Sequence, residues 1–247
     1  MLPAPPTLTL NDTALFLDVD GTLVELVDDP AAVLVAPQLV ATLRLLSTRL
    51  SGALALVSGR ELVSLDQIFA PELFPAAGAH GAEIRLAGAG ETLTTTQAFP
   101  ENAWAALAHF ADGLDGILVE RKHGAAALHF RQRPDLAEDC RLLATSIVES
   151  IGSSFRLIAG KMVYEIAPSA HDKGRAINTF LEFAPFKGRT PVFVGDDITD
   201  EDGFAAVTQC SGTGVIVGER SDTQATFALP DVTAVHAWLT ATQTASE

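Results

Sequence analysis

The feature that most constrains the fold is a repeated pattern of short apolar runs, each followed by a segment with helical periodicity. The runs include 14-ALFLDVD-20, 53-ALALVSGR-60 and 191-PVFVGDD-197. After the first run, the leucines of 38-QLVATLRLL-46 recur at helical spacing. Such alternation predicts βαβ units, and strands that are apolar throughout suit a sheet covered on both faces. We therefore predict an α/β protein with a Rossmann-like, doubly wound parallel sheet.

The middle of the chain predicts a different arrangement. Strand-like segments at 117–122 and 125–131 are followed by a helix-like segment at 136–150. Two more strand-like segments, at 155–159 and 162–167, pair across a short turn. This order predicts an open-faced antiparallel sheet backed by helices.

Two lengths of chain are predicted to form one core around this insertion. Residues 1–82 and 168–247 carry the parallel-sheet pattern, and 83–167 is expected to be an inserted α+β cap domain. Within the insertion, the small polar residues of 88–97 predict an exposed loop. A chain of 247 residues is long enough for both parts.

Charge and cysteine content exclude several classes of protein. The formal charge of −15 would repel nucleic-acid backbones and anionic membranes, so neither is an expected partner. Cys140 and Cys210 lack metal-site spacing and are too few for a disulfide framework, so we expect two reduced core thiols. Because there is no signal-peptide pattern and no apolar run that could span a bilayer, we expect a cytoplasmic protein, acting as a monomer.

The acidic pair at the end of the first apolar run is the sharpest chemical feature. In 18-DVDGTL-23, Asp18 and Asp20 stand at the carboxyl end of a predicted strand, where open parallel sheets bind their ligands. Alternation turns both carboxylates to one side, so they can face one cation, and Mg²⁺ prefers oxygen ligands. Asp next to Gly is also common in ordinary turns, so this motif alone does not decide the function.

Three further motifs suit a phosphate and metal site. The motif 58-SGR-60 offers a hydroxyl, a flexible backbone and a guanidinium to phosphate oxygens. Lys173 precedes a helix-like segment at 175–183. In 195-GDDITDED-202, five carboxylates within eight residues repel one another unless a cation or basic partner compensates. Each motif alone also fits an ordinary role, as a solvated turn, a surface lysine or an acidic helix start.

Taken together and in this order, the four motifs resemble those of the haloacid dehalogenase superfamily of phosphatases. The resemblance implies that Asp18 is a nucleophile that forms an aspartyl-phosphate, and that Asp20 is the general acid and then the base. It also implies that Asp18, the Asp20 carbonyl and Asp196 hold Mg²⁺, while Lys173 balances charge on Asp18 and the phosphate.

The same resemblance supplies the other predicted residues of the phosphate site. Thr22 and Ser58 would hydrogen-bond the transferring phosphoryl group, with Gly59 and Arg60 of the same motif beside it. Asp200 would orient a metal-bound water or the lysine, because only some acids of such a cluster can reach one octahedral ion.

A second set of motifs resembles the family of trehalose-6-phosphate phosphatases. These motifs are 78-GAHGAE-83, 120-ERK-122, 129-HFR-131, 160-GKMVYEIAP-168 leading to 172-DKG-174, and 195-GDDITDED-202. They span nearly the whole chain. The resemblance implies hydrolysis of trehalose 6-phosphate to trehalose and phosphate.

In that family, two glutamates and a lysine on cap strands grip the sugar hydroxyls distal to the phosphate. Those positions match Glu120, Lys122 and Glu165. Alternation sends the first two to one side of their strand, although an exposed cross-strand ion pair is the ordinary alternative. The further candidate substrate ligands are His80, His129 and Arg131, the last two on one face of their strand.

Two other functions stay open at this point. One is another capped sugar phosphatase, acting on sucrose phosphate or mannosyl-phosphoglycerate. The other is a non-catalytic phosphosugar-binding module in which Asp18 accepts phosphate without rapid turnover, although Asp20 would then serve no purpose. The one departure from the family pattern is Phe130, where tyrosine is expected, and its side chain is predicted to face away from the sugar.

Overall fold

The computed structural model describes residues 2–27, 33–88, 90, 92–94, 97–122 and 124–244. The chain divides into two compact units. Unit 1 contains residues 1–93 and 172–247, and unit 2 contains residues 94–171. None of the described helices is long and apolar enough to cross a membrane.

Unit 1 is built on a large, mainly parallel sheet. Its strands are β1 (Thr13–Leu17), β2 (Leu54–Val57), β3 (Ala76–Gly78), β4 (Glu83–Arg85), β5 (Thr92–Thr94), β10 (Thr190–Gly195), β11 (Thr213–Val217) and β12 (Phe227–Leu229). The strand order is β12-β11-β10-β1-β2-β3-β4-β5, and β4 pairs antiparallel with β3. β1 therefore lies inside the sheet, parallel to both β10 and β2. The predicted α/β class with a doubly wound parallel sheet is confirmed.

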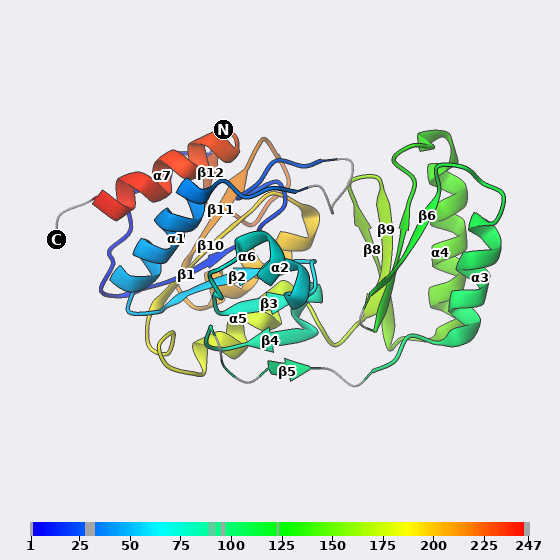
Figure 1. Cartoon of the computed structure of the whole chain (residues 1–247), viewed down its shortest axis with the longest axis horizontal. Helices are drawn as coiled ribbons and strands as arrows, with labels where there is room; N and C mark the ends of the chain where they lie inside the picture. Colours follow the sequence, from blue (N-terminus) through cyan, green and yellow to red (C-terminus); the bar gives the residue numbers. More distant parts are fainter. Residues whose placement is uncertain are drawn as a thin grey trace. The chain divides into compact units, whose positions relative to one another are not determined.

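Helices cover both faces of this sheet. They are α1 (Pro37–Arg49), α2 (Leu62–Phe69), α5 (Lys173–Leu181), α6 (Glu201–Gln209) and α7 (Val232–Thr244). The connections β1-α1-β2 and β10-α6-β11 run in opposite directions along the sheet, so right-handed crossovers place α1 and α6 on opposite faces. α7 packs beside α1, as Figure 1 shows, and α5 packs against α6.

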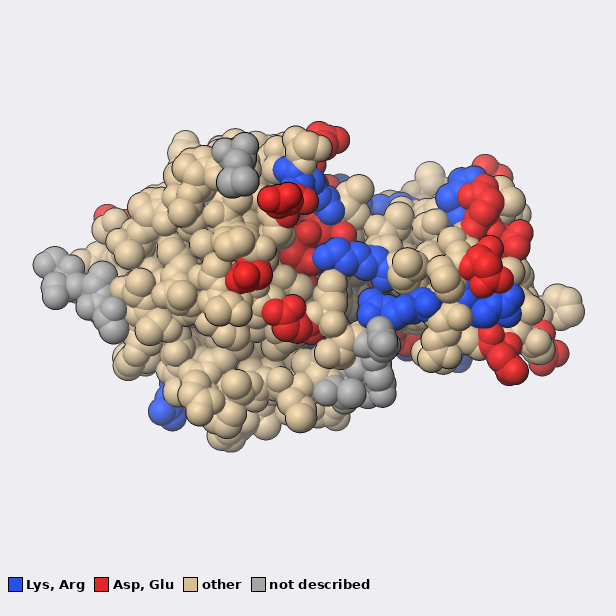
Figure 2. All heavy atoms as spheres, turned by 90° about the horizontal axis from the view of Figure 1, so that it is seen from above, with Lys and Arg blue, Asp and Glu red and all other residues tan. Residues whose placement is uncertain are grey.

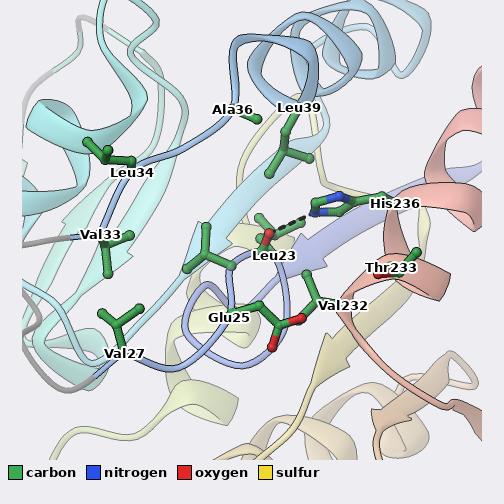
Figure 3. Close-up of a pocket in the computed structure, with 11 residues that line it drawn as sticks. Leu23, Glu25, Val27, Val33, Leu34, Ala36, Leu39, Val232, Thr233 and His236 are labelled. Carbon is green, nitrogen blue, oxygen red and sulfur yellow. Dashed lines mark hydrogen bonds between the residues drawn. The ribbon is translucent and has the colours of Figure 1, made fainter.

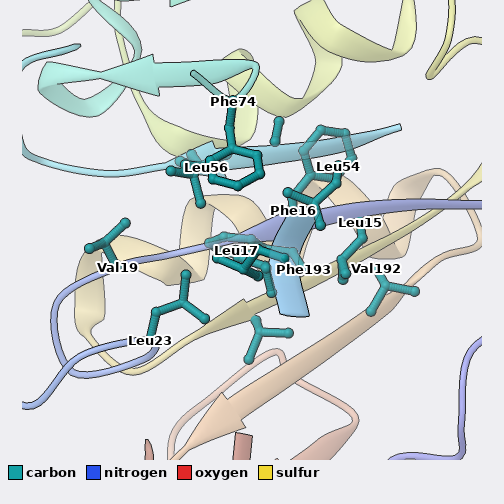
Figure 4. Close-up of a cluster of buried hydrophobic side chains, with 14 of the residues drawn as sticks. Leu15, Phe16, Leu17, Val19, Leu23, Leu54, Leu56, Phe74, Val192 and Phe193 are labelled. Atoms are coloured by element: carbon teal, nitrogen blue, oxygen red, sulfur yellow. The ribbon is translucent and has the colours of Figure 1, made fainter. Parts of the chain in front are cut away.

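The core of unit 1 explains why these segments adopt strands and helices. All five residues of β1 and all four of β2 are buried, as expected for strands covered on both faces. Side chains of β1, β2 and β10 belong to one buried cluster, and the register places Phe16 of β1 beside Phe193 of β10 (Figure 4). In α1 the buried face consists of Leu39, Leu43 and Leu46, the periodic residues of the sequence, and the helix begins with a proline at its first position.

Unit 2 contains a four-stranded antiparallel sheet. Its strands are β6 (Leu118–Lys122), β7 (Ala125–His129), β8 (Phe155–Gly160) and β9 (Val163–Pro168), in the order β6-β7-β9-β8, and its helices are α3 (Glu101–Ala111) and α4 (Ala137–Ile151). Ala126, Leu128 and Ile166 share one face of the sheet and pack with Leu107 and Ile147 from the two helices. The residues that alternate with them lie on the other face of the sheet.

Three expectations about the organisation were wrong in detail. β4 and β5 extend the large sheet, so 83–93 belongs to unit 1 and not to the insertion, which runs from 94 to 171. The segment 88–97, expected to be a loop, contains the exposed strand β5; residues 89, 91, 95 and 96 lie outside the described residues. Both cysteines are free, but Cys210 is exposed at the end of α6 and is not a core thiol.

Surface charges in unit 2 are paired locally. Arg133 pairs with Asp135 and Arg141 pairs with Glu138, each with a shortest distance of 2.6 to 2.7 Å. On the face that Figure 2 shows, many of the basic side chains lie next to acidic ones.

Candidate active site

The carboxyl ends of β1 and β10 bring the two acidic motifs together. The parallel register aligns Leu17 with Val194, and the Asp18 N–H donates to the Val194 carbonyl at 2.9 Å. Asp18 therefore leaves β1 beside Asp196, which follows Gly195 at the end of β10. Both carboxylates are buried.

A buried lysine joins these motifs. Lys173 is the first residue of α5, and the Asp172 side chain caps this helix by accepting the Arg175 N–H at 2.7 Å. The Lys173 ammonium donates to Asp18 at 2.8 Å and to Asp200 at 2.6 Å. All three side chains are buried, so each charge depends on the others for compensation.

Asp200 uses both of its oxygens inside the protein. Oδ1 binds Lys173, and Oδ2 accepts the backbone N–H groups of Asp196 and Asp197 at 2.8 Å each. A Cβ at Gly195 would lie 2.3 Å from the Asp200 carboxyl carbon, so this close packing requires glycine there. Asp200 thus fixes both the lysine and the acidic loop, which agrees with an orienting role.

Burial and neighbouring charges together set the proton affinities in this cluster. It raises the pKa of Asp18 well above its ordinary value; the charges of Asp200 and Asp196 add to this, whereas Lys173 opposes it. Burial alone would lower the pKa of Lys173, but Asp18 and Asp200 outweigh it and raise that pKa. Lys173 is therefore charged, because two carboxylates lie within 2.8 Å. Further positive charge beside Asp18 would favour its ionised form.

The same residues fit a cation with oxygen ligands. One carboxylate oxygen each from Asp18, Asp196 and Asp200 lie within 4.8 Å of one another. Because Asp200 already binds Lys173 and two backbone N–H groups, Asp18 and Asp196 are the better ligands. Gly21 has φ +82°, and a Cβ there would lie 2.2 Å from Asp196 Oδ2, so only glycine keeps the space at this carboxylate. An all-oxygen set of this kind suits Mg²⁺.

Asp20 has a different partner from Asp18. Its two carboxylate oxygens accept from Nε and Nη2 of Arg60, at 2.7 Å each. Arg60 was predicted beside the phosphoryl group, and the structure places its guanidinium on Asp20 instead. No sequence pattern predicts this pair, since the two residues are 40 positions apart.

The other predicted phosphate ligands lie on neighbouring loops of unit 1. Thr22 is fully buried, and its hydroxyl has no hydrogen-bond partner among the described residues, so it can bind an added acceptor or donor. Ser58 is buried after β2 and accepts the Arg60 N–H at 3.1 Å. His80 has φ +54°, and its ring covers Gly59, where a Cβ would lie 2.7 Å from Nε2.

The predicted sugar ligands share one face of the unit 2 sheet. In the register, Ala127 lies opposite both Glu120 and Glu165, so these three side chains point to the same face. Lys122 donates to Glu165 at 2.6 Å, and His129 lies 2.8 Å from Glu120. Lys122 reaches Glu165 across the small side chains of β7, whereas His129, on β7 itself, contacts Glu120 on the adjacent β6.

Arg131 and Phe130, which follow His129 in the sequence, lie in different surroundings. Arg131 was predicted on the strand of His129, but β7 ends at His129 and Arg131 lies in the turn that follows. Phe130 is buried and stacks on Tyr164 at 5.0 Å between ring centroids, among the side chains that pack against the helices. It therefore lies on the other face from Glu120.

One residue beside the acidic loop was not identified in the sequence. Arg220 follows β11, and its guanidinium lies 3.6 Å from Asp197 and 3.9 Å from Glu201. Its position could have been found from the motif 218-GERSD-222, because this polar segment also follows an apolar strand, next to β10 in the sheet.

A pocket of about 300 Å³ lies elsewhere in unit 1 (Figure 3). Its lining is mostly apolar, with Leu23 and Leu39 facing Val232, and His236 donates to the Leu23 carbonyl at 2.8 Å. None of the predicted catalytic side chains lines it, so we assign it no part in the chemistry.

Sequence comparisons identify the family of the chain. The family model of trehalose-phosphatase matches residues 16–233. A protein of Escherichia coli strain K12 named trehalose-6-phosphate phosphatase is 41% identical over 227 residues, which are 92% of this chain and 85% of that protein.

Solved structures share the fold. The C-terminal domain of trehalose-6-phosphate phosphatase from C. albicans superposes with a TM-score of 0.86 at 22% identity, covering 98% of this chain and 99% of that one. A phosphatase of the haloalkanoate (HAD) superfamily from Bacteroides thetaiotaomicron gives a TM-score of 0.59 at 16% identity, covering 96% of each chain. The matched family model and the extent of the sequence identity together show that the chain belongs to the trehalose-phosphatase family.

Proposed function

We propose that this protein hydrolyses trehalose 6-phosphate to trehalose and phosphate, with Mg²⁺ as cofactor. The observation that carries the proposal is the buried Lys173, 2.8 Å from Asp18 at the carboxyl end of the central strand. A buried carboxylate with a cationic partner suits a nucleophile that attacks an anionic phosphate. The family membership and the names of the relatives support this substrate.

In the proposed first step, an oxygen of Asp18 attacks phosphorus while the bond between phosphorus and the sugar oxygen breaks. The carboxyl group of Asp20 gives its proton to the departing sugar oxygen. In the second step, water attacks phosphorus, the Asp20 carboxylate takes a proton from that water, and the bond between phosphorus and Asp18 breaks. Phosphate leaves, and both carboxyl groups return to their starting states.

The protein groups around this reaction would neutralise and orient the phosphate. Asp18, the Asp20 carbonyl and Asp196 would hold Mg²⁺, which when bound offsets negative charge on the phosphate and on Asp18. Lys173 stabilises the same charge from the protein side, and Thr22 offers a buried hydroxyl to a phosphoryl oxygen. Ser58 is proposed as a second hydroxyl ligand.

Sugar recognition is proposed for the charged face of unit 2. Carboxylates and ammonium groups form strong hydrogen bonds with hydroxyls, and the Lys122–Glu165 ion pair and the His129–Glu120 hydrogen bond hold these groups in place before the sugar arrives. Glu120, Lys122 and Glu165 would bind the glucose ring that carries no phosphate. His129 and Arg131 would be further ligands of that ring.

Phosphate release from trehalose 6-phosphate, compared with a panel of sugar phosphates, tests the proposal. We expect the highest kcat/KM for trehalose 6-phosphate, loss of activity with a chelator and recovery with Mg²⁺. Sucrose 6-phosphate and mannosyl-3-phosphoglycerate represent the other capped sugar phosphatases. Preference for one of these would exclude the proposed substrate, and activity unaffected by the chelator would exclude the metal requirement.

A further inference from the structure

Arg60 makes a planar, two-pronged contact with Asp20. Nε and Nη2 each lie 2.7 Å from a different carboxylate oxygen, and Nη1 lies 3.3 Å from the Ser64 hydroxyl. The Arg60 side chain is 11% exposed and that of Asp20 is 31% exposed. Such a bidentate pair fixes the plane of the carboxylate as well as its distance.

The backbone of Arg60 is itself fixed. Its N–H donates to the Ser58 hydroxyl at 3.1 Å, and its carbonyl accepts the Ala79 N–H at 2.7 Å. A Cβ at Gly78 would lie 2.8 Å from the Arg60 carbonyl oxygen, so the loops after β2 and β3 pack closely here. The guanidinium therefore extends from a rigid base, which is what an orienting group requires.

Asp20 has less support from its own surroundings. It lies beyond β1, joined to Val24 by one isolated bridge, and Gly21 follows it in the left-handed region at φ +82°. Its carboxylate is more exposed than those of Asp18, Asp196 and Asp200. A half-exposed aspartate at a turn has several accessible rotamers, so its orientation depends on the guanidinium.

We infer that Arg60 is a positioning residue that orients Asp20 for proton transfer, and is not a phosphate ligand. The inference rests on the proposed function, in which Asp20 gives a proton to the sugar oxygen and later takes one from water. That proton is held on a carboxylate lone pair that the two Arg60 N–H donors leave open. Proton transfer requires the carboxylate oxygen within about 2.6–3.2 Å of its partner. A misplacement of about 1 Å costs on the order of 100-fold in rate.

The first test separates turnover from binding. For Arg60→Ala and Arg60→Gln we expect kcat for trehalose 6-phosphate to fall about 100-fold, with KM within about 3-fold of wild type. Arg60→Lys should recover only part of the rate, because an ammonium cannot hold both oxygens. The matched control is Arg44→Ala, which removes an exposed ion pair with Glu72 and should leave both constants unchanged.

The second test measures binding without turnover. In an Asp18→Asn background, calorimetric titration with trehalose 6-phosphate should give Kd values within about 3-fold of each other with and without Arg60→Ala. If Arg60 is a phosphate ligand, its removal will weaken binding more than about 10-fold, and that result overturns the inference. Circular dichroism of each variant distinguishes these outcomes from misfolding.

The third test is a double-mutant cycle on p-nitrophenyl phosphate, a small ester that does not depend on sugar recognition. If Arg60 acts through Asp20, adding Arg60→Ala to Asp20→Ala should cost less than about 3-fold further. If the rate loss of the double variant equals the product of the losses of the two single variants, the inference is overturned. A wild-type protein that hydrolyses this ester but not trehalose 6-phosphate would refute the proposed substrate, yet the cycle would still decide the role of Arg60.

Discussion

The charges of the core and those of unit 2 are held by different means. In unit 1, Lys173, Asp18 and Asp200 are buried, and they come from three separate segments: the start of α5, the end of β1 and the 3-10 turn after β10. In unit 2, Glu120, Lys122, His129 and Glu165 are neighbours on adjacent strands of one sheet. Each core charge therefore depends on the whole fold, whereas each unit 2 charge depends on strand register.

This difference suggests how the two sites tolerate change. Removing one member of a buried cluster leaves the others uncompensated, which is costly. In unit 2, Glu120 is 44% exposed, so water can replace it at smaller cost, whereas the side chains of Lys122 and Glu165 are almost as buried as those of the core. We expect core substitutions to affect chemistry or folding, and unit 2 substitutions to affect the choice of substrate.

Asp18→Asn should have the largest effect. An amide cannot replace the carboxylate as nucleophile, so we expect kcat for trehalose 6-phosphate to fall by at least about 1,000-fold. The rate of phosphate release under single-turnover conditions measures this loss of activity. The variant should be folded without denaturant, although losing one charge of the buried cluster lowers its unfolding midpoint. Retained turnover would remove Asp18 from the mechanism.

Asp200→Ala should have the next largest effect, on stability. It deletes one carboxylate from buried Lys173 and the acceptor of two backbone N–H groups, so we expect a loss of about 3 kcal/mol in the free energy of unfolding. Urea unfolding followed by fluorescence measures this. Asp222→Ala, at an exposed position of the same unit, is the control and should change stability by less than about 0.5 kcal/mol. An equal loss of unfolding free energy in Asp200→Ala and Asp222→Ala would contradict the special role of the buried cluster.

Glu165→Ala and Lys122→Ala should alter selectivity instead. We expect kcat/KM for trehalose 6-phosphate to fall about 10- to 100-fold, because a buried hydrogen bond to a charged group is lost, while p-nitrophenyl phosphate turnover changes little. The control is Arg133→Ala, which removes an exposed ion pair of the same unit. Equal losses on both esters would argue against sugar recognition by this face.

Glu120→Gln should have the smallest effect, and it depends on pH. The hydrogen bond from His129 lowers the pKa of Glu120 below its ordinary 4.5, so ionised Glu120 stabilises the fold above that pH. This contribution is lost as the pH falls through the lowered pKa. Since the side chain is 44% exposed, the difference should be about 0.5 kcal/mol or less. The urea midpoints of wild type and variant should differ at pH 7 and converge at pH 3. The same difference between the midpoints at both pH values would contradict this pH dependence.

Most of the fold was predictable because its signals are local. Apolar runs and helical periodicity identified β1, β2, β10 and α1, and the rule that parallel sheets bind at their carboxyl ends led to Asp18 and Asp196. The edge of the large sheet was missed because β4 and β5 have only three residues each and adjoin a polar segment. A short edge strand is stabilised more by pairing with the neighbouring strand than by the β-propensity of its own residues.

The pairs within the site were less predictable than its members. Strand alternation placed Glu120 and Lys122 on one side, yet it could not show which carboxylate each cation contacts. Lys173 is 155 positions from Asp18, and Arg60 is 40 positions from Asp20, so these pairs follow from tertiary packing alone. The same holds for Arg220, which meets the acidic loop only because β11 lies beside β10.

The place of β1 in the sheet also matters during synthesis. One of its two neighbours, β2, follows within 40 residues, but the other, β10, begins only at Thr190. At a translation rate of about 5–20 residues per second, β1, whose residues are all buried in the folded protein, waits roughly 10–35 seconds with one edge unpaired. An unpaired apolar edge is a template for aggregation. Chains that stop before β10 should therefore aggregate, and the nascent protein should depend on chaperones until that strand emerges from the ribosome.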